Sequence, residues 1–311
     1  MGNASSSEGE AEIPFIKDSE KSPRNVLERY AEHIKKQAEN DAKNYASSLK
    51  GELWKASFKG AYDEWLRVDR YGYSNPCYLN HIKHTNILYA LANDRNPCLF
   101  SPVERFSNEG EAECDNNKIR GNEKKINGAG ACAPYRRRHI CDKNLEALTV
   151  QNTKNSDDLI GNISVTAKYE GESIVKNHPH KGTSDVCTAL ARSFADIGDI
   201  VRGKDMFKPN DKVEKGLREV FKKIHEDLST DMKKVYPEDV TGNYFKLRED
   251  WWTANRDKVW QAITCNAPYK SRYFMHSENN TQLFSNRQCG HEQGNVPTNL
   301  DYVPQFLRWY N

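Results

Sequence analysis

The chain contains several stretches in which apolar residues return every three or four positions, the spacing of an amphipathic helix. The first covers residues 22–46 and begins with Ser22 and Pro23, residue types favoured at the N-cap and at the first helical position. Its apolar positions predict one stripe that needs a partner to pack against. The stripe consists of Val26, Leu27, Tyr30, Ile34 and Ala38.

Similar patterns follow further along the chain. They predict helices over residues 183–202, 211–234 and 248–265, the middle one with apolar residues at i, i+4, i+7 and i+8. An amphipathic helix is also expected within residues 51–68, and another starts after Pro304. Together these elements predict a mainly α-helical protein with a helical bundle in its C-terminal part.

The region between these stretches has another character. Residues 72–165 are rich in Gly, Asn and Cys, so we expect mostly loops, with short helices at 79–93 and around 143–150. Residues 151–182 are polar, and we expect them to connect the two halves of the chain without a helix.

Eight cysteines are present, and no two of them have the CxxC spacing common in zinc sites. Disulfides are the better interpretation, which implies an oxidising compartment. Five cysteines precede the polar stretch 151–180 and three follow it. Either one bridge crosses that stretch, or one thiol is free, or its partner lies beyond residue 311. The cysteines are Cys77, Cys98, Cys114, Cys132, Cys141, Cys187, Cys265 and Cys289.

The composition describes a folded chain with a polar surface. Hydrophobic residues make up 37%, while 6 Trp, 15 Tyr and 11 Phe supply the large side chains that disordered chains lack. No apolar run approaches the roughly 18 residues of a membrane span, and residues 1–12 contain no apolar core of the signal-peptide type. Gly2 and Ser6 match the myristoylation pattern, although a flexible acidic tail is the simpler interpretation.

Charge is distributed unevenly, although the net charge is only +2. Residues 114–143 contain eight lysines and arginines against three acids, a net charge of +5, and residues 21–60 contain nine against five, a net charge of +4. Such patches attract anionic ligands over roughly 10 Å in ordinary salt. Because disulfides argue against an intracellular protein that binds nucleic acid, an extracellular sulfated glycan is the better candidate.

The basic residues of these two regions are therefore the candidate glycan-binding residues. The planar fork of arginine binds sulfate or carboxylate oxygens in pairs, and Arg136, Arg137 and Arg138 stand together between Cys132 and Cys141. The alternative for each of these arginines is a structural ion pair with an acidic residue. The full candidate set is Arg24, Arg29, Lys35, Lys36, Lys50, Lys55, Lys59, Lys118, Arg120, Lys124, Lys125, Arg136, Arg137 and Arg138.

No motif indicates an enzyme, a cofactor or a metal site. GAGACA at residues 128–133 satisfies a dinucleotide-binding pattern in its letters only, because no strand pattern precedes it and Pro134 follows. Cys77, His81 and His84 could share a helical face as metal ligands, but no fourth ligand is close in sequence, and Cys77 is expected in a disulfide. Neither GxSxG nor HExxH is present. We expect no catalytic residue, no cofactor and no bound metal.

Four stretches resemble the homology blocks of Duffy-binding-like domains. They are GACAPYRRRHICDKNLE (130–146), ALARSFADIGDIVRGKDMF (189–207), DWWTANRDKVWQAITC (250–265) and DYVPQFLRWY (301–310). The run from DIGDIVRG to DYVPQFLRW resembles the alpha class of these domains, and KSPRNVLERYAEHIKK (21–36) resembles the N-terminal segment that precedes that class. Over nearly its whole length the chain is similar to the start of the erythrocyte membrane protein 1 family, the variant surface antigens of the falciparum malaria parasite.

The resemblance implies a disulfide-braced Duffy-binding-like fold. It divides the chain into an N-terminal helical segment (1–73) packed on the domain, a loop-rich subdomain 1 (74–165) and a helical-bundle subdomain 2 (166–311). The third subdomain of the family is then missing. In subdomain 1 we expect two nested bridges, which are Cys98–Cys141 and Cys114–Cys132.

The resemblance also implies a function. Members of the family lack an ordinary signal peptide, are exported by infected red cells, and are anchored on the red-cell surface by a transmembrane segment far downstream. The pair Cys265 and Cys289 with the letters DMFKP (205–209) resembles a subgroup linked to rosetting, the binding of uninfected red cells. The implied partners are red-cell receptors such as heparan sulfate or heparin-like glycans, blood-group sugars and complement receptor 1.

The resemblance changes which of the candidate residues are expected to bind a glycan. The block that contains Arg136–Arg138 is shared by the family, which favours a scaffold role for these arginines and shifts the expected site towards the N-terminal helix and the KIRGNEKK loop (118–125). The alternatives are a protein–protein adhesion module and an antigenic spacer without a glycan site. Asn3, Asn162 and Asn279 begin N-glycosylation sequons, which this family usually leaves unmodified.

Overall fold

The structure of the protein is a computed structural model. It describes residues 23–58, 74–87, 92–99, 101–106, 111–126, 130–180, 184–278 and 281–309. The predictions for Gly2, Asn3, Lys59 and Asn279, and most of the helix expected within 51–68, lie outside the described residues.

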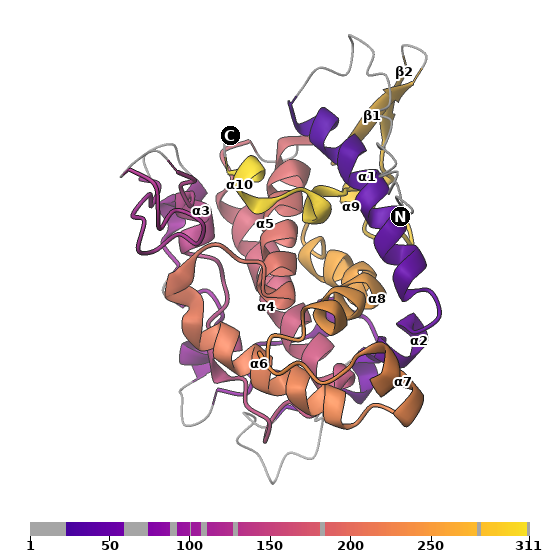
Figure 1. Ribbon diagram of the computed structural model, residues 1–311. Helices are drawn as coiled ribbons and strands as arrows, with labels where there is room; N and C mark the ends of the chain where they lie inside the picture. The colour runs from indigo at the N-terminus through magenta and orange to yellow at the C-terminus, as the bar shows by residue number, and fades with distance from the viewer. Residues whose placement is uncertain are drawn as a thin grey trace, which may run out of the picture.

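The described chain is mainly helical, which confirms the predicted fold class. Its long helices are α1 (Pro23–Ala42), α4 (Ser156–Asn177), α5 (Ser184–Arg202), α6 (Asp211–Glu226) and α8 (Phe245–Ile263). Helices α4, α5 and α8 occupy the centre, and α1 runs along one side (Figure 1). The short helix α3 (Tyr135–Arg138) lies with its neighbouring loops on the opposite side, and α6 runs below the centre together with α7 (Thr230–Val235).

The core lies where the long helices meet. Trp251 and Trp260 of α8 are buried. Phe194 of α5 packs edge-on against Trp260, with 5.2 Å between ring centroids, and Phe221 of α6 packs edge-on against Trp251 at 5.9 Å. Because a buried aromatic side chain removes about 150–250 Å² from water, these contacts hold the bundle together. The helices predicted from apolar spacing at α5, α6 and α8 are confirmed.

The predicted helix over 211–234 is divided into α6 and α7. Ser229 is the N-cap of α7, and its side-chain oxygen accepts a hydrogen bond from the backbone N–H of Met232 at 3.3 Å. A capped helix start of this kind satisfies an amide that would otherwise lack a partner.

Helix α4 corrects the expectation that residues 151–182 contain no helix. Asn155 caps its first turn by accepting from the backbone N–H of Asp158 at 2.9 Å. The helix is buried although many of its residues are polar, because Asn162 and Thr166 exchange hydrogen bonds with other segments. Gly171 allows α8 to approach closely, since a Cβ atom there would lie 1.9 Å from the carbonyl oxygen of Ile263. Helix α4 runs across the subdomain boundary predicted at residue 165.

The N-terminal segment packs on the domain through α1, which contacts α8 and the 3-10 helix η8 (Leu300–Tyr302). The predicted apolar stripe is docked only in part: Leu27 and Ala38 pack against the core, whereas Tyr30 is 55% and Ile34 40% exposed. The residues of α1 that are buried are Asn25, Glu28, Ala31 and Ala42. The docking face includes polar residues because the domain supplies hydrogen-bond partners for them, which the periodicity of the helix alone does not reveal.

Four disulfides join all eight cysteines, and none is free. The two nested bridges expected in subdomain 1 are confirmed. The bridge Cys77–Cys265 crosses the polar stretch 151–180. Of the three alternatives for the uneven distribution of cysteines, a crossing bridge is therefore correct, and a free thiol or a partner beyond residue 311 is not needed. The four pairs are Cys77–Cys265, Cys98–Cys141, Cys114–Cys132 and Cys187–Cys289.

The remaining elements are short. The predicted helix at 79–93 is wrong for residues 79–87, which form turns and extended chain, whereas a 3-10 helix confirms the one expected near 143–150. None of the described helices is long and apolar enough to cross a membrane. The strands are β1 (Phe274–Glu278) and β2 (Thr281–Phe284), an antiparallel hairpin that was not predicted. The short helices are α2 (Ala46–Leu49), α9 (Arg287–Gly290), α10 (Gln305–Arg308), η2 (Leu53–Lys55), η3 (Pro76–Tyr78), η4 (Ala92–Arg95), η5 (Val103–Phe106), η6 (Leu145–Ala147) and η7 (Lys208–Asn210).

Candidate ligand-binding surface

Arg137 is a structural residue. Its side chain is 1% exposed, and its Nε donates to Asp205 Oδ1 at 3.1 Å while Nη2 contacts Asp205 Oδ2. Burial disfavours the charged guanidinium, but the charge and hydrogen bonds of Asp205, together with the charges of Asp196 and Asp142, outweigh burial and raise the pKa of Arg137. The prediction that Arg137 contacts a glycan is therefore wrong, because a ligand cannot reach a side chain buried against its own counter-ion.

The neighbouring arginines are also committed to contacts within the fold. Arg136 pairs with Asp196 of α5 at 2.7 Å and donates to Ser193 Oγ at 3.0 Å. Arg138 donates to the backbone oxygen of Glu111 at 2.9 Å. Burial opposes ionisation of Asp196, but the charges of Arg136, Arg308 and Arg137 hold its pKa well below the usual range. Arg136 and Arg138 keep only part of their surface in contact with water.

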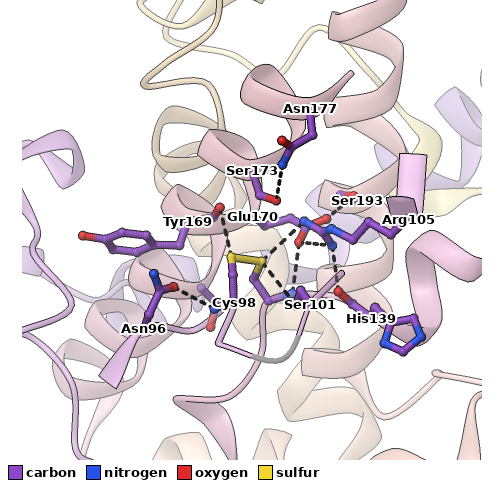
Figure 2. The surroundings of a disulfide bond; sticks show 12 residues. Asn96, Cys98, Ser101, Arg105, His139, Tyr169, Glu170, Ser173, Asn177 and Ser193 are labelled. Atoms are coloured by element: carbon purple, nitrogen blue, oxygen red, sulfur yellow. Dashed lines mark hydrogen bonds and ion pairs between the residues drawn. A yellow bond between two sulfur atoms is a disulfide. The ribbon is translucent and has the colours of Figure 1, made fainter. Parts of the chain in front are cut away.

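The arginine run is connected to a buried hub around Glu170 of α4, beside the disulfide Cys98–Cys141 (Figure 2). Arg105 pairs with Glu170 Oε2 at 2.8 Å, and the backbone N–H of Cys141 donates to the same oxygen at 3.0 Å. Ser193 Oγ donates to Glu170 Oε1 at 2.7 Å. Since Ser193 also accepts from Arg136, the hub ties α3 and the bridge Cys98–Cys141 to α4 and α5, which supports a scaffold role for this block.

The loop 111–126 differs from the arginine run because its lysines face solvent. The disulfide Cys114–Cys132 closes the loop, and Asn122 holds it by donating to the backbone oxygen of Ala131 at 2.8 Å. Lys118 pairs with Glu113 at 2.7 Å, while Lys124 and Lys125 are exposed and have no ion-pair partner among the described residues. The expectation that this loop presents basic side chains is consistent with their exposure.

Helix α6 extends this exposed basic surface. Arg120 reaches Asp211 at the start of α6, at 3.6 Å, and the backbone N–H of Lys208 donates to the oxygen of Lys118 at 2.9 Å. Lys215 and Lys222 follow on the solvent side of α6, both exposed and without an ion-pair partner in the described part of the chain. We name this surface the α6 basic face. It consists of Arg120, Lys124, Lys125, Lys215, Arg218 and Lys222.

A groove of about 610 Å³ lies beside the α6 basic face, between α6 and the turn 241–244. Arg120, Lys215, Arg218 and Lys222 line it, together with three acids. Glu214 already forms ion pairs with Arg218 at 3.0 Å and with Arg248 at 2.8 Å, and Asp211 forms one with Arg120. Only the positions of Lys215 and Lys222 in the folded chain show which lysines of α6 have no ion-pair partner among the described residues.

The basic residues of the N-terminal segment lie elsewhere. Helix α1 and the loops around α3 are on opposite sides of the molecule (Figure 1), so the two predicted basic regions do not form one patch. Arg24 is structural, since it donates to Thr188 Oγ1 at 2.8 Å and to the oxygen of Phe274 at 3.0 Å. The others, Lys35, Lys36, Lys50 and Lys55, pair with Glu39, Glu32, Asp257 and Glu52.

The structure also places the candidate metal ligand Cys77 and the sequon residue Asn162. Cys77 lies in a disulfide, and the described residues contain no group of three or more side chains placed to hold a metal ion. Asn162 is fully buried inside α4, and its side chain donates to the oxygen of Asp158 at 2.9 Å. This sequon is therefore inaccessible to a glycosylating enzyme in the folded protein.

Comparison with known proteins shows the family of this chain. The Duffy binding domain model matches residues 130–308, more than half of the chain, and the model of the N-terminal segments of PfEMP1 matches residues 22–57. The chain is similar to the Duffy receptor beta form of Plasmodium knowlesi, with 28% identity over 151 residues that cover 45% of this chain and 11% of that receptor.

Solved structures give longer matches. The NTS-DBL1-alpha and CIDR-gamma double domain of PfEMP1 from the Plasmodium falciparum varO strain has a TM-score of 0.85 and 51% identity, covering 93% of this chain and 43% of that chain. The NTS-DBL1(alpha-1) domain from the same strain has a TM-score of 0.76 and 48% identity, covering 94% and 60%. A DBLb domain of PfEMP1 bound to human ICAM-1 has a TM-score of 0.69 and 28% identity, covering 91% and 60%. The chain therefore spans less than two thirds of each of these solved chains.

Proposed function

Because the chain belongs to the Duffy-binding domain family and carries an N-terminal segment of the PfEMP1 type, we propose that it is an adhesin head that binds red-cell receptors in rosetting and sulfated glycans such as heparan sulfate. In this proposal it acts outside the parasite, on the surface of the infected erythrocyte. The glycan site is the α6 basic face with its groove. Arg136 to Arg138 and Arg24 belong to the scaffold.

The observation that supports this site is a set of exposed lysines that form no ion pair with any described residue. Lys124, Lys125, Lys215 and Lys222 are exposed around one side of the molecule, and none of them is paired with a described acid. A sulfated polysaccharide presents a row of anionic groups, and each lysine that contacts one displaces a counter-ion. Release of these ions drives binding and makes it sensitive to salt, as it does for nucleic acids.

The test is binding of the 311-residue chain to immobilised heparin across a salt series. We expect Lys215→Ala/Lys222→Ala to weaken binding and to lower the slope of log affinity against log salt by about one per lysine. The matched control is Lys36→Ala/Lys43→Ala, which removes the same charge from the N-terminal segment on the other side. Equal losses in both variants, or no dependence on salt, would contradict the site.

A second candidate function is protein–protein adhesion beside the turn 241–244, which lines the same groove. Val240 and Phe245 are exposed on either side of the turn 241–244, and one structural neighbour is a DBLb domain bound to human ICAM-1. An interface of this kind depends mainly on apolar burial and little on salt. Red-cell binding that Phe245→Ser abolishes, while the lysine variant leaves it unchanged, would favour this function over glycan binding.

A further inference from the structure

The disulfide Cys77–Cys265 joins the 3-10 helix η3 to the turn that follows α8. Both of its cysteines are half-buried, so each keeps part of its surface in contact with solvent. Neither cysteine belongs to the α6 basic face or its groove, and the argument for this bridge does not rest on the function proposed above.

His291 lies against this bridge. Its Nε2 atom is 3.7 Å from Cys77 Sγ, and its Nδ1 atom is 2.8 Å from Thr264 Oγ1. The Thr264 hydroxyl is also 2.7 Å from the backbone oxygen of Trp260. A carbonyl has no proton, so two oxygens this close need the hydroxyl hydrogen of Thr264 between them. Thr264 therefore accepts a hydrogen bond from His291, and Nδ1 is the ring nitrogen that carries the proton.

The other ring nitrogen of His291 is an acceptor that lacks a donor. Burial lowers the pKa of His291, against the opposing effects of the Glu292 charge and the Gln261 carbonyl, so the ring is neutral near pH 7. A neutral ring protonated at Nδ1 has a lone pair at Nε2. The sulfur of Cys77 has no hydrogen while the bridge is intact, and no other donor to Nε2 lies among the described residues.

Reduction of the bridge would supply the missing donor. It gives Cys77 a thiol hydrogen, and a thiol S–H can donate to the lone pair of His291 Nε2 that already faces it. The reduced form then gains a hydrogen bond that the oxidised form does not have. A disulfide whose reduced form is stabilised is reduced more readily, because its equilibrium with external thiols shifts towards the dithiol.

A strained segment holds the histidine and the bridge together. Gln288 and Cys289 have φ values of 54° and 55°, in the left-handed region that residues other than glycine rarely adopt. The side chain of Gln288 donates to the backbone oxygens of Thr264 and Cys265, at 3.3 Å and 2.9 Å. Strained backbone of this kind persists where its surroundings over-determine it, and such positions gather at functional sites.

The other three bridges lack this arrangement. Both cysteines of Cys187–Cys289 are fully buried, and so is one cysteine of Cys98–Cys141. Cys114–Cys132 is half-buried on both sides, like Cys77–Cys265, but no contact joins it to a histidine in the part of the chain that the structure describes. Since exposed bridges exchange with thiols more readily than buried ones, two bridges are accessible, and His291 distinguishes one of them.

We propose that Cys77–Cys265 is a thiol–disulfide exchange site that takes a small aliphatic thiol of the cysteine or glutathione class, with His291 as its proton carrier. The thiolate of the small thiol attacks Cys265 Sγ. A new S–S bond forms between these two atoms, the bond to Cys77 breaks, and its electron pair leaves on Cys77 Sγ. The proton that the attacking thiol loses is taken up at His291 Nε2 and shared with the Cys77 sulfur.

A second small thiol completes the reaction. Its thiolate attacks the sulfur of the bound small thiol, the two small thiols leave as their own disulfide, and the electron pair stays on Cys265 Sγ, which takes the second proton. Two external thiols are oxidised and one bridge is reduced to two thiols. Attack is expected at Cys265 because a leaving thiolate that is stabilised departs faster, and Cys77 is the sulfur beside His291.

The test incubates the folded 311-residue chain near pH 7 with glutathione and glutathione disulfide at a series of ratios. Free thiols are then blocked, the remaining bridges are reduced and labelled differently, and peptide mass spectrometry gives the reduced fraction of each bridge. We expect the equilibrium constant for reduction of Cys77–Cys265 to exceed that of Cys114–Cys132 about tenfold, a difference of about 30 mV. Samples quenched early should contain the glutathione adduct on Cys265.

His291→Leu removes the acceptor and keeps a side chain of similar size. We expect it to lower the equilibrium constant of Cys77–Cys265 about tenfold, because the reduced form loses its added hydrogen bond, and to leave Cys114–Cys132 unchanged as the internal control. Circular dichroism shows whether the variant folds, and if it does not, the ranking of the bridges in the wild type still decides. The proposal is overturned by equal reduction of the two bridges in the wild type, by reduction of all four together, by adducts on Cys77 alone, or by a folded His291→Leu variant with an unchanged constant.

Discussion

Two basic runs that lie close in the sequence have opposite surroundings in the fold. Arg136–Arg138 and the loop 118–125 are both rich in positive charge and both lie beside a disulfide. In the first run Arg136 and Arg137 pair with Asp196 and Asp205 and Arg138 donates to a backbone oxygen, whereas Lys124 and Lys125 of the second face water without ion-pair partners among the described residues. The comparison shows that the role of a basic run depends on which acids the fold brings to it.

The physical reason is the cost of leaving a charge out of water. A buried arginine is tolerated only with a counter-ion and good hydrogen bonds, and Arg137 finds both in Asp205. An exposed lysine remains hydrated, and it contributes little to stability. The first run therefore stabilises the domain, and the second is available for a ligand.

The largest expected effect comes from breaking the buried pair. Arg137→Ala leaves Asp205 without its main counter-ion, and we expect the free energy of unfolding to fall by about 3–5 kcal/mol. Chemical denaturation followed by circular dichroism measures this change. A loss below about 1 kcal/mol would show that Arg137 is not the structural residue that its burial indicates.

The next test removes the disulfide that holds the exposed run. Cys114→Ser/Cys132→Ser is expected to lower the free energy of unfolding by about 3 kcal/mol, the typical value for a loop of this length. Heparin affinity should fall as well, because the loop 118–125 then loses its fixed position. Unchanged stability together with unchanged heparin binding would show that the bridge does not position the loop.

A third test compares two buried carboxyls. Several arginines hold the pKa of Asp196 low, while Glu28 has mainly Arg24 nearby and its pKa is raised to about 7 from 4.5. The folded state therefore binds a proton more tightly than the unfolded state does. The stabilising effect of this protonation is complete below pH 4.5 and is lost as pH rises through 7, a change of roughly 3 kcal/mol.

Glu28→Gln removes this titration, so the difference between wild type and variant in unfolding free energy should change between pH 4.5 and 7.5. Denaturation at several pH values measures it. The control is Glu39→Gln, an exposed carboxyl on the same helix. A wild-type profile parallel to that of Glu28→Gln would contradict the raised pKa.

The smallest effect on stability is expected from the exposed run itself. Lys124→Ala/Lys125→Ala should change the free energy of unfolding by less than about 0.5 kcal/mol, because neither lysine has an ion-pair partner among the described residues. The same variant should reduce the salt slope of heparin binding by up to about two. A destabilised variant would place these lysines in the scaffold with Arg137.

The sequence predicted those helices whose buried side is apolar. Helices α5, α6 and α8 follow from spacing because their core side chains include Phe194, Phe221 and Trp260. Helix α4 was missed because it buries Asn162 and Glu170, whose partners come from distant segments. Polar residues are read as exposed when their partners are unknown, and in α4 they obscured the helical spacing of the buried Leu159, Ile163 and Ala167.

The residues of the candidate site are likewise divided into those that could be predicted from the sequence and those that could not. Exposure of the loop 118–125 was expected from its sequence, and the scaffold role of Arg136–Arg138 was implied by the family block. Which lysines of α6 have no ion-pair partner among the described residues, and that Arg29 lines a pocket, could not be predicted, because both depend on elements far apart in the chain.

The sequence by itself determined the helical class, the disulfide-stabilised character and the family of this protein, because apolar periodicity, cysteine content and family blocks are local properties. The tertiary structure decided which charges are buried with partners, which carboxyl has its pKa raised, and where the basic surfaces lie. These properties depend on distances between residues separated by up to 271 positions in the sequence, and Coulomb interactions and desolvation act through those distances rather than through the order of the chain.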